Sequence, residues 1–161
     1  MKQNKYDDSS FFEKYSNMER SKYGLEGAGE WHELRKMLTD FQGKRVLDLG
    51  CGFGWHSRYA VENGASSVIG IDISQRMLDE ARSKTTSSDI RYICMPIEDM
   101  DFQPDSFDIV ISSLVLHYIK SFENVLRKVS NCLVKGGELV FSVEHPIFTA
   151  QKKVIGLYII F

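Results

Sequence analysis

The sequence predicts an α/β fold in which a mostly parallel sheet carries helices on both faces. Two observations support this fold class. Short apolar runs alternate with segments whose apolar residues recur at helical spacing, and a glycine-rich segment joins the first such run to the next helix. The chain has 161 residues and no internal repeat or flexible linker. We therefore expect one domain over residues 1–161, divided into an N-terminal cap (1–42), a core (43–148) and a short apolar tail (149–161).

The cap is expected to be helical. Aromatic and apolar residues between positions 11 and 18 would share one face of a short helix. Glycines near position 27 then interrupt regular structure. Apolar residues recur at helical spacing from Trp31 to Phe41, which predicts a second helix over residues 30–40.

In the core, strands and helices are expected to alternate. The apolar runs predict strands at residues 45–49, 67–72, 90–95, 107–113 and 138–143. Helical spacing predicts helices at residues 55–63, after Ser74, and at 122–133. Ser74 and Ser121 are suited to cap the last two helices, since a serine hydroxyl accepts a hydrogen bond from a free backbone amide.

Composition excludes several classes of protein. The formal net charge is −2, so there is no overall basic character to favour nucleic acid, and none is expected as a partner. The three cysteines are odd in number and widely spaced, which fits neither a disulfide framework nor a metal site. No signal peptide and no apolar run of about 20 residues is present. We expect a cytoplasmic protein that does not enter a membrane.

The glycine-rich segment runs Asp48-Leu49-Gly50-Cys51-Gly52-Phe53-Gly54, after a predicted strand and before a predicted helix. Glycines at alternate positions allow a sharp turn and leave no Cβ in the way of a ligand. Asp72 ends the next strand, 20 residues after Gly52, where a carboxylate can accept both hydroxyls of an adenosine ribose. A dinucleotide-binding G-x-G-x-x-G pattern is the nearest competitor, but Trp55 occupies the position of its third glycine.

The form acidic-x-Gly-x-Gly-x-Gly resembles the first motif of class I S-adenosylmethionine-dependent methyltransferases, which have a Rossmann-like fold. Four further segments resemble later motifs of that family in order: residues 69–74, 104–110, 113–118 and 133–139. The resemblance covers about residues 40–148 and is closest to methyltransferases of type 11. It implies S-adenosylmethionine as cofactor.

The resemblance also implies a set of cofactor-binding residues. They are Asp48, Gly50, Cys51, Gly52, Gly54, Asp72, Ile73, Met77, Ile97, Glu98, Ser113 and Leu114. The three glycines would line the methionine and ribose, with Asp48 orienting the loop. Asp72 would bind the ribose hydroxyls, and Ile73 would pack on the adenine. Ser113 and Leu114 would lie close to the sulfonium.

One position departs from the family pattern. Many relatives carry an acidic residue after the third strand, where this chain has Pro96, which offers neither a carboxylate nor an amide hydrogen. Adenine recognition would then depend on the Ile97 amide or on Glu98, although Glu98 fits a solvated acidic loop equally well. Asp72 also has an alternative role as a helix cap. Tyr15, Arg20 and Tyr23 precede the core, where relatives often fold a lid over the cofactor.

The implied activity is methyl transfer to an unidentified acceptor, which the slight acidity favours as a small molecule. His117 and His145 are the candidate general bases, each with an alternative structural role. Relatives normally continue with a helix and an antiparallel hairpin, which would be missing here because only 13 residues follow Phe148. A second hypothesis is therefore an S-adenosylmethionine-binding fragment, or a non-catalytic partner or sensor protein.

The apolar tail suggests how the exposed sheet edge is managed. Residues Val154–Phe161 are rich in β-branched side chains, which suit a pleated surface. We expect this segment either to pair as a strand against residues 138–143 or to mediate self-association, because an unpaired apolar edge invites pairing. A disordered stub is the alternative.

Overall fold

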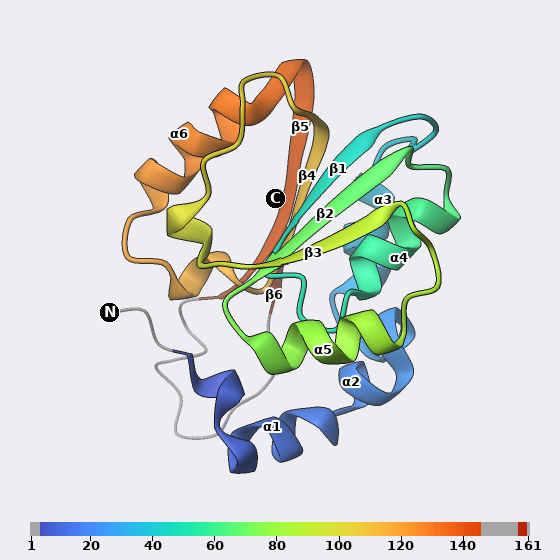
Figure 1. Cartoon of the computed structure of the whole chain (residues 1–161), viewed down its shortest axis with the longest axis vertical. Coiled ribbons are helices and arrows are strands. Elements are labelled where there is room, and N and C mark those ends of the chain that lie inside the picture. The colour runs from blue at the N-terminus through green and yellow to red at the C-terminus, as the bar shows by residue number, and fades with distance from the viewer. Residues whose placement is uncertain (1–3, 146–157, 161) are drawn as a thin grey trace.

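The computed structural model describes residues 4–145 and 158–160. One six-stranded sheet runs through them in the order β3-β2-β1-β4-β5-β6 (Figure 1). Its strands are β1 (Arg45–Leu49), β2 (Ser67–Asp72), β3 (Ile90–Cys94), β4 (Phe107–Ser113), β5 (Leu133–Glu144) and β6 (Tyr158–Ile160). The first five are parallel, and β6 is antiparallel to β5. The chain adds β2 and β3 on one side of β1, then β4 and β5 on the other, so the topology switches between β1 and β4.

Helices cover both faces of the sheet, and short 3₁₀ helices connect some of the elements (Figure 1). The core helices are α4 (Trp55–Glu62), α5 (Gln75–Ser83) and α6 (Phe122–Cys132), with η3 (Ile97–Asp99) and η4 (Leu116–Tyr118) in the loops. The cap comprises η1 (Lys5–Asp7), α1 (Ser9–Ser16), α2 (Glu19–Tyr23), η2 (Gly24–Gly27) and α3 (Trp31–Met37). None of the helices in the described residues is long and apolar enough to cross a membrane. The predicted doubly wound fold with its helical cap is confirmed.

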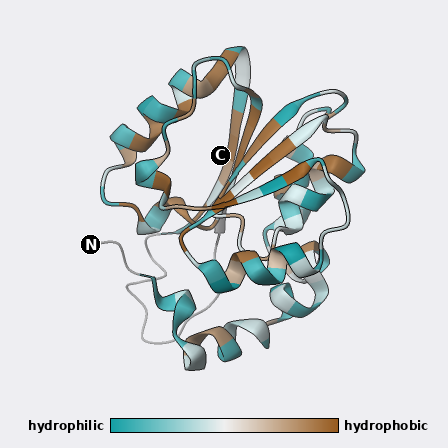
Figure 2. Ribbon diagram, viewed as in Figure 1, coloured by the Kyte–Doolittle hydropathy of each residue, from teal (hydrophilic) through white to brown (hydrophobic). Residues whose placement is uncertain are grey.

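Alternation along β1 divides the core into two layers. Leu47 and Leu49 face α6 and pack with Val125 and Val129. Val46 faces the opposite side and packs with Ala60 of α4. The strands are largely hydrophobic where they cross the centre of the molecule (Figure 2). Complete burial of such side chains contributes about 1.5–3 kcal/mol each, so the sheet is a firm support for its loops.

Among the strands, the core helices and α3, two boundaries differ from the sequence prediction by more than one residue. Helix α3 ends at Met37 rather than at Asp40, because Leu38 adopts an extended conformation with ψ of 131°. Leu38 and Phe41 then pack beside α4 instead of continuing the helix. Strand β5 begins at Leu133 rather than at Glu138. Leu133 pairs with Phe107 ahead of a register shift, after which Glu138 pairs with Ile109.

The tail prediction is confirmed where the structure describes it. Strand β6 pairs antiparallel with the end of β5, Ile160 opposite Ser142 and Tyr158 opposite Glu144. This contact involves residues 142–144, at the carboxyl end of the predicted range 138–143 and one residue beyond it. The rest of the predicted tail strand, residues 154–157 and 161, lies outside the described residues, and self-association stays a prediction.

Candidate functional site

The glycine-rich loop leaves the carboxyl end of β1 and is hydrogen-bonded to the end of β2. The amides of Gly50 and Cys51 both donate to the Ile71 carbonyl, at 2.8 and 3.0 Å. The Gly52 amide donates to Asp72 Oδ2 at 2.9 Å. The loop therefore lies beside the switch between β1 and β4, where open α/β sheets bind their ligands.

The three glycines of the loop have positive φ angles, but they meet different surroundings. A Cβ on Gly50 would lie 2.5 Å from the Val115 side chain, and one on Gly54 would lie 2.1 Å from the Tyr92 hydroxyl. A Cβ on Gly52 would meet only the Tyr15 hydroxyl, at 4.0 Å. Gly50 and Gly54 are thus required by packing, whereas Gly52 has room for a Cβ beneath the Tyr15 hydroxyl.

Asp72 is a buried carboxylate that organises this space. Its Oδ2 accepts from Gly52, and its Oδ1 accepts from the Ser74 amide at 2.9 Å. Burial raises the pKa of Asp72 above its usual range, and the two amide donors oppose that shift. The Ser74 hydroxyl in turn accepts from the Met77 amide and caps α5, as expected. Asp72 therefore has a structural role as well as a position suited to a ribose.

Asp48 lies on the α4 side of the sheet rather than on the surface of the loop. It is buried and accepts a hydrogen bond of 2.6 Å from the Ser57 hydroxyl. Burial raises its pKa from 3.8 to about 7. This placement suits the expected role in orienting the loop, because the contact joins the end of β1 to α4.

The other residues of the predicted set lie around the same edge of the sheet. Cys51, Met77 and Ile97 are buried. Ile73 is half-buried, and its carbonyl accepts a hydrogen bond from Asn4 of the cap. The Glu98 carbonyl accepts from Lys128 Nζ at 2.8 Å.

The end of β4 has an unusual backbone. Leu114 has a φ of 53°, which is costly for a residue with a side chain. Its amide donates to the carbonyl of Ser142 at 3.0 Å, and it also lies 3.2 Å from the Ser142 hydroxyl. The Ser113 hydroxyl donates to Glu30 of the cap at 3.0 Å. These bonds fix Ser113 and Leu114 beside the end of β5.

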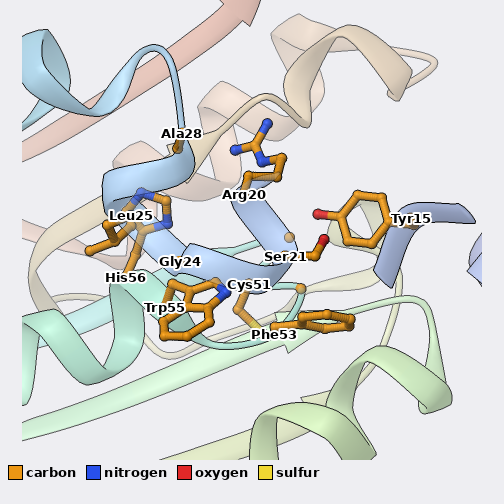
Figure 3. A pocket seen from close by; sticks show the side chains of 12 residues that line it. Tyr15, Arg20, Ser21, Gly24, Leu25, Ala28, Cys51, Phe53, Trp55 and His56 are labelled. Carbon is orange, nitrogen blue, oxygen red and sulfur yellow. The ribbon is translucent and has the colours of Figure 1, made fainter. Parts of the chain in front are cut away.

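The cap closes over the glycine-rich loop (Figure 3). The Tyr15 ring meets the Phe53 ring edge-on, with 5.6 Å between their centroids. Between cap and loop lies a cavity of about 50 Å³. Its walls are Tyr15, Arg20, Ser21, Gly24, Leu25 and Ala28 from the cap and Gly50–Phe53, Trp55 and His56 from the loop and α4. Tyr15 and Arg20 of the predicted lid thus reach the site, whereas Tyr23 is 69% exposed.

Two acidic cap residues at this edge are absent from the sequence prediction. Asp7 accepts hydrogen bonds from the Ser74 hydroxyl and the Arg76 amide, and so contacts the start of α5. Glu30 is buried and pairs with Arg20 at 2.7 Å. Asp7 is 67 residues from Ser74, so no local spacing signals the contact. For Glu30, the available signal is an acidic residue directly before an apolar helical stripe.

The three histidines near the site have different surroundings. His117 lies in η4, with Nε2 3.8 Å from Glu144 Oε2, and neither ring nitrogen has a hydrogen-bond partner among the described residues. Burial lowers the pKa of His117. His145 directly follows β5. His56 is buried, which lowers its pKa to about 4 and keeps its imidazole neutral.

A sheet of this strand order, with a glycine-rich loop after β1 and a carboxylate at the end of β2, defines the class I methyltransferase-type domain. The family model described as a methyltransferase domain matches residues 47–141. The chain belongs to this methyltransferase domain family. The predicted family and its cofactor, S-adenosylmethionine, are confirmed.

Two solved structures show the same fold at high sequence identity. A candidate S-adenosylmethionine-dependent methyltransferase from Listeria monocytogenes is 58% identical, with a TM-score of 0.73 over 75% of this chain. An S-adenosylmethionine-dependent methyltransferase from Mesorhizobium loti is 46% identical, with a TM-score of 0.75 over 78% of this chain. The chain covers 57% of each of those two chains.

Two curated relatives come from Haemophilus influenzae. One, of uncharacterised function, is 36% identical over 92% of this chain, which spans 61% of that protein. The other is a tRNA U34 carboxymethyltransferase, 40% identical over 69% of this chain and 36% of its own length. The chain thus spans less than two thirds of the length of these relatives.

Proposed function

We propose that this chain binds S-adenosylmethionine over the Gly52 amide and transfers its methyl group to a small-molecule acceptor. One observation carries the proposal: the carboxylate of Asp72 and the small cavity above Gly52 lie together at the topological switch of the sheet. In this arrangement Asp72 accepts the ribose hydroxyls and Ile73 borders the adenine, near Met77, Ile97 and Glu98. Gly52 leaves room for the methionine portion.

The chain's own residues then have to position the reactants. S-adenosylmethionine, when bound, supplies a methyl group that its sulfonium makes electrophilic. Tyr15 and Phe53 exclude water from above the loop. Ser113 and Leu114 lie beside the loop, where hydrogen bonds hold them in place. Alignment of two reactants in this way contributes on the order of 7–11 kcal/mol to lowering a barrier.

His117 is our first candidate for a general base, and His145 the second. The lowered pKa of His117 leaves the ring neutral near pH 7, so it can accept a proton. Glu144 lies close enough to stabilise the imidazolium that would form. His145 is the residue directly after Glu144, at the carboxyl end of β5.

The acceptor has two candidate classes. A small molecule is favoured by the net charge of −2, which gives no general attraction to a polyanion. A tRNA is favoured by the 40% identity to the carboxymethyltransferase from H. influenzae. That match covers 36% of the relative, so the acceptor-binding parts of the two proteins need not correspond. A cytoplasmic location belongs to the same proposal and agrees with the three free cysteines.

The test is transfer of a labelled methyl group from S-adenosylmethionine to pooled metabolites and, separately, to bulk tRNA. Label in a small-molecule product, with one equivalent of S-adenosylhomocysteine released, supports the proposal. Label in tRNA alone would replace the acceptor class. Binding of S-adenosylhomocysteine without transfer to either pool would favour the non-catalytic fragment, partner or sensor.

A further inference from the structure

The cavity between the cap and the glycine-rich loop carries several hydrogen-bond donors. Its volume is about 50 Å³, and its polar lining includes the hydroxyls of Tyr15 and Ser21 and the indole N–H of Trp55. Figure 3 shows the two hydroxyls pointing toward each other and the indole nitrogen pointing into the space between cap and loop. The described residues that line the cavity include no aspartate or glutamate. The chemistry of the lining therefore suits an anion.

Two of these donors are available to a ligand. Ser21 is 6% exposed, and neither its hydroxyl nor Trp55 Nε1 is hydrogen-bonded to another group among the described residues. The Trp55 ring is also fixed in place. A Cβ on Gly24 would lie 2.7 Å from one side of the ring, and the guanidinium of Arg58 lies 4.4 Å from its centroid. The N–H of Trp55 thus has a defined direction.

The positive end of α4 adjoins the same cavity. Trp55 is the first residue of α4, and the preceding Gly54 has no side chain that could cap the helix. The N-terminus of a helix carries roughly half a positive charge and binds anions through its free amides. Arg20 adds a cation to the lining. Burial is the main cause of the raised pKa of Tyr15, and the Arg20 charge opposes it, so this charge acts on groups in the cavity.

The cavity lies next to the proposed ribose site. The Gly52 amide donates to Asp72, and Gly52 also lines the cavity. A nucleoside whose ribose is held at Asp72 therefore has the cavity within reach of the group attached to that ribose. In S-adenosylmethionine this group is methionine, which carries a carboxylate. A cavity of about 50 Å³ is far too small for a nucleoside, but it has room for a group of a few atoms.

We propose that Ser21 Oγ, Trp55 Nε1 and the first turn of α4 bind the carboxylate of the methionine part of S-adenosylmethionine, so that the cap selects against related nucleosides without this carboxylate. The inference rests on the proposed function, because it requires the ribose to be held at Asp72. Ser21 belongs to the cap and Trp55 to the core, so the carboxylate joins the two. A ligand that carries the carboxylate therefore closes the cap as it binds.

The test compares S-adenosylmethionine with decarboxylated S-adenosylmethionine, which differ only in the carboxylate. In calorimetric titrations without an acceptor, the parent should bind S-adenosylmethionine about tenfold more tightly or better, since hydrogen bonds to charged groups are the strong ones. Ser21→Ala and Trp55→Phe, which each remove one donor, should each weaken binding of S-adenosylmethionine by about threefold to tenfold. Binding of the decarboxylated compound should change by less than about twofold. The ratio of the two affinities cancels any general loss of structure.

Hydrogen exchange gives a second measurement that a purely structural role would not affect. The amides of α2 should be protected by saturating S-adenosylmethionine and not by the saturating decarboxylated compound. Ser83→Ala is the matched control, because Ser83 is an exposed helical serine whose hydroxyl donates to the Glu80 carbonyl. It should leave both affinities unchanged within about twofold. If Trp55→Phe fails to fold, Ser21→Ala alone gives the ratio.

Two results would overturn the inference and leave the proposed function intact. One is equal affinity of the parent for the two compounds. The other is an affinity ratio that stays at the parent value in both Ser21→Ala and Trp55→Phe. Failure of the parent to bind either compound would instead overturn the proposed function.

Discussion

The backbone amide of Gly52 donates a 2.9 Å hydrogen bond to Oδ2 of Asp72. This bond joins the loop after β1 to the end of β2, so the two parts of the proposed cofactor site hold each other in place. Asp72 Oδ1 also accepts from Ser74 at the start of α5. Asp72, which we expect to bind the ribose, therefore also stabilises the fold through these two hydrogen bonds.

Asp72→Ala should weaken binding of S-adenosylhomocysteine by about 2–3 kcal/mol, because hydrogen bonds to a charged group contribute roughly 1.5–3 kcal/mol each. It should also lower the thermal midpoint, since the amides of Gly52 and Ser74 lose their acceptor. Asp72→Asn should cost less in binding. Calorimetric titration and thermal unfolding measure the two effects.

The control for Asp72 is Asp79→Asn, which changes an exposed carboxylate of α5 that pairs with Arg82. It should bind the ligand as the parent does. A lower thermal midpoint for Asp72→Ala together with unchanged affinity would mean that Asp72 acts only in the fold.

Gly54→Ala and Gly52→Ala should separate a loss of stability caused by overpacking from a loss of affinity caused by filling the space for the ligand. At Gly54 the new methyl would lie 2.1 Å from the Tyr92 hydroxyl, so overpacking and left-handed strain each cost about 1–3 kcal/mol of stability. At Gly52 only the strain applies, and the methyl instead occupies the space proposed for the cofactor. Urea unfolding should therefore rank Gly54→Ala as the less stable, while Gly52→Ala loses affinity for S-adenosylhomocysteine. Unchanged affinity in a folded Gly52→Ala protein would contradict the placement of the ligand.

Asp48→Asn should change how stability depends on pH. Burial raises the pKa of Asp48 from 3.8 to about 7, so folding favours its protonated form. The contribution of Asp48 to the stability of the fold is fully present below pH 3.8 and is lost as pH rises through about 7. An asparagine is neutral throughout and keeps an acceptor for Ser57. The variant should exceed the parent in stability at pH 8, on the order of 1 kcal/mol per pKa unit, and this advantage should shrink toward pH 4.

Urea unfolding at several pH values measures the effect for Asp48. Asp108→Asn is the opposite control, because hydrogen bonding to Arg45 lowers the pKa of Asp108. That variant should lose stability at neutral pH and little at pH 2. Parallel pH profiles for the parent and Asp48→Asn would show that Asp48 is ionised in the fold at no cost.

The cap should open for the cofactor to enter. The cavity of about 50 Å³ holds a few water molecules, far less than a nucleoside joined to an amino acid. We expect hydrogen exchange in α1 and α2 to be fast in the free protein and to slow when S-adenosylhomocysteine binds. The amides of β1 serve as an internal reference. Exchange in α1 and α2 that is equal with and without a saturating ligand would contradict this movement.

The core of the fold follows from local pattern to a large extent. Strands β1, β2 and β4 have the predicted bounds, because each is a buried apolar run ended by polar or glycine residues. The end of α3 and the start of β5 did not follow. Leu38 leaves the helix to pack beside α4, and β5 gains its first residues through a pairing with Phe107. Both depend on partners that are distant in the sequence.

The part of the site that could be predicted is the part whose residues belong to one motif with a known spacing. The loop Gly50–Gly54 and Asp72 lie together as the spacing indicated. The spacing does not reveal that a Cβ has room at Gly52, whereas a Cβ at Gly54 would clash with the Tyr92 hydroxyl. Nor could it reveal Asp7 or Glu30, since their contacts with Ser74 and Ser113 form only when the cap folds onto the sheet.

The most direct test of the account is calorimetric titration of the protein with S-adenosylhomocysteine and, in parallel, with NAD⁺. We predict saturable binding of S-adenosylhomocysteine at one site, weakened in Asp72→Ala and unaffected in Asp79→Asn, with no heat of binding for NAD⁺. Tight binding of NAD⁺ with no response to S-adenosylhomocysteine would contradict the assignment of the loop between β1 and α4 as a methyltransferase cofactor site.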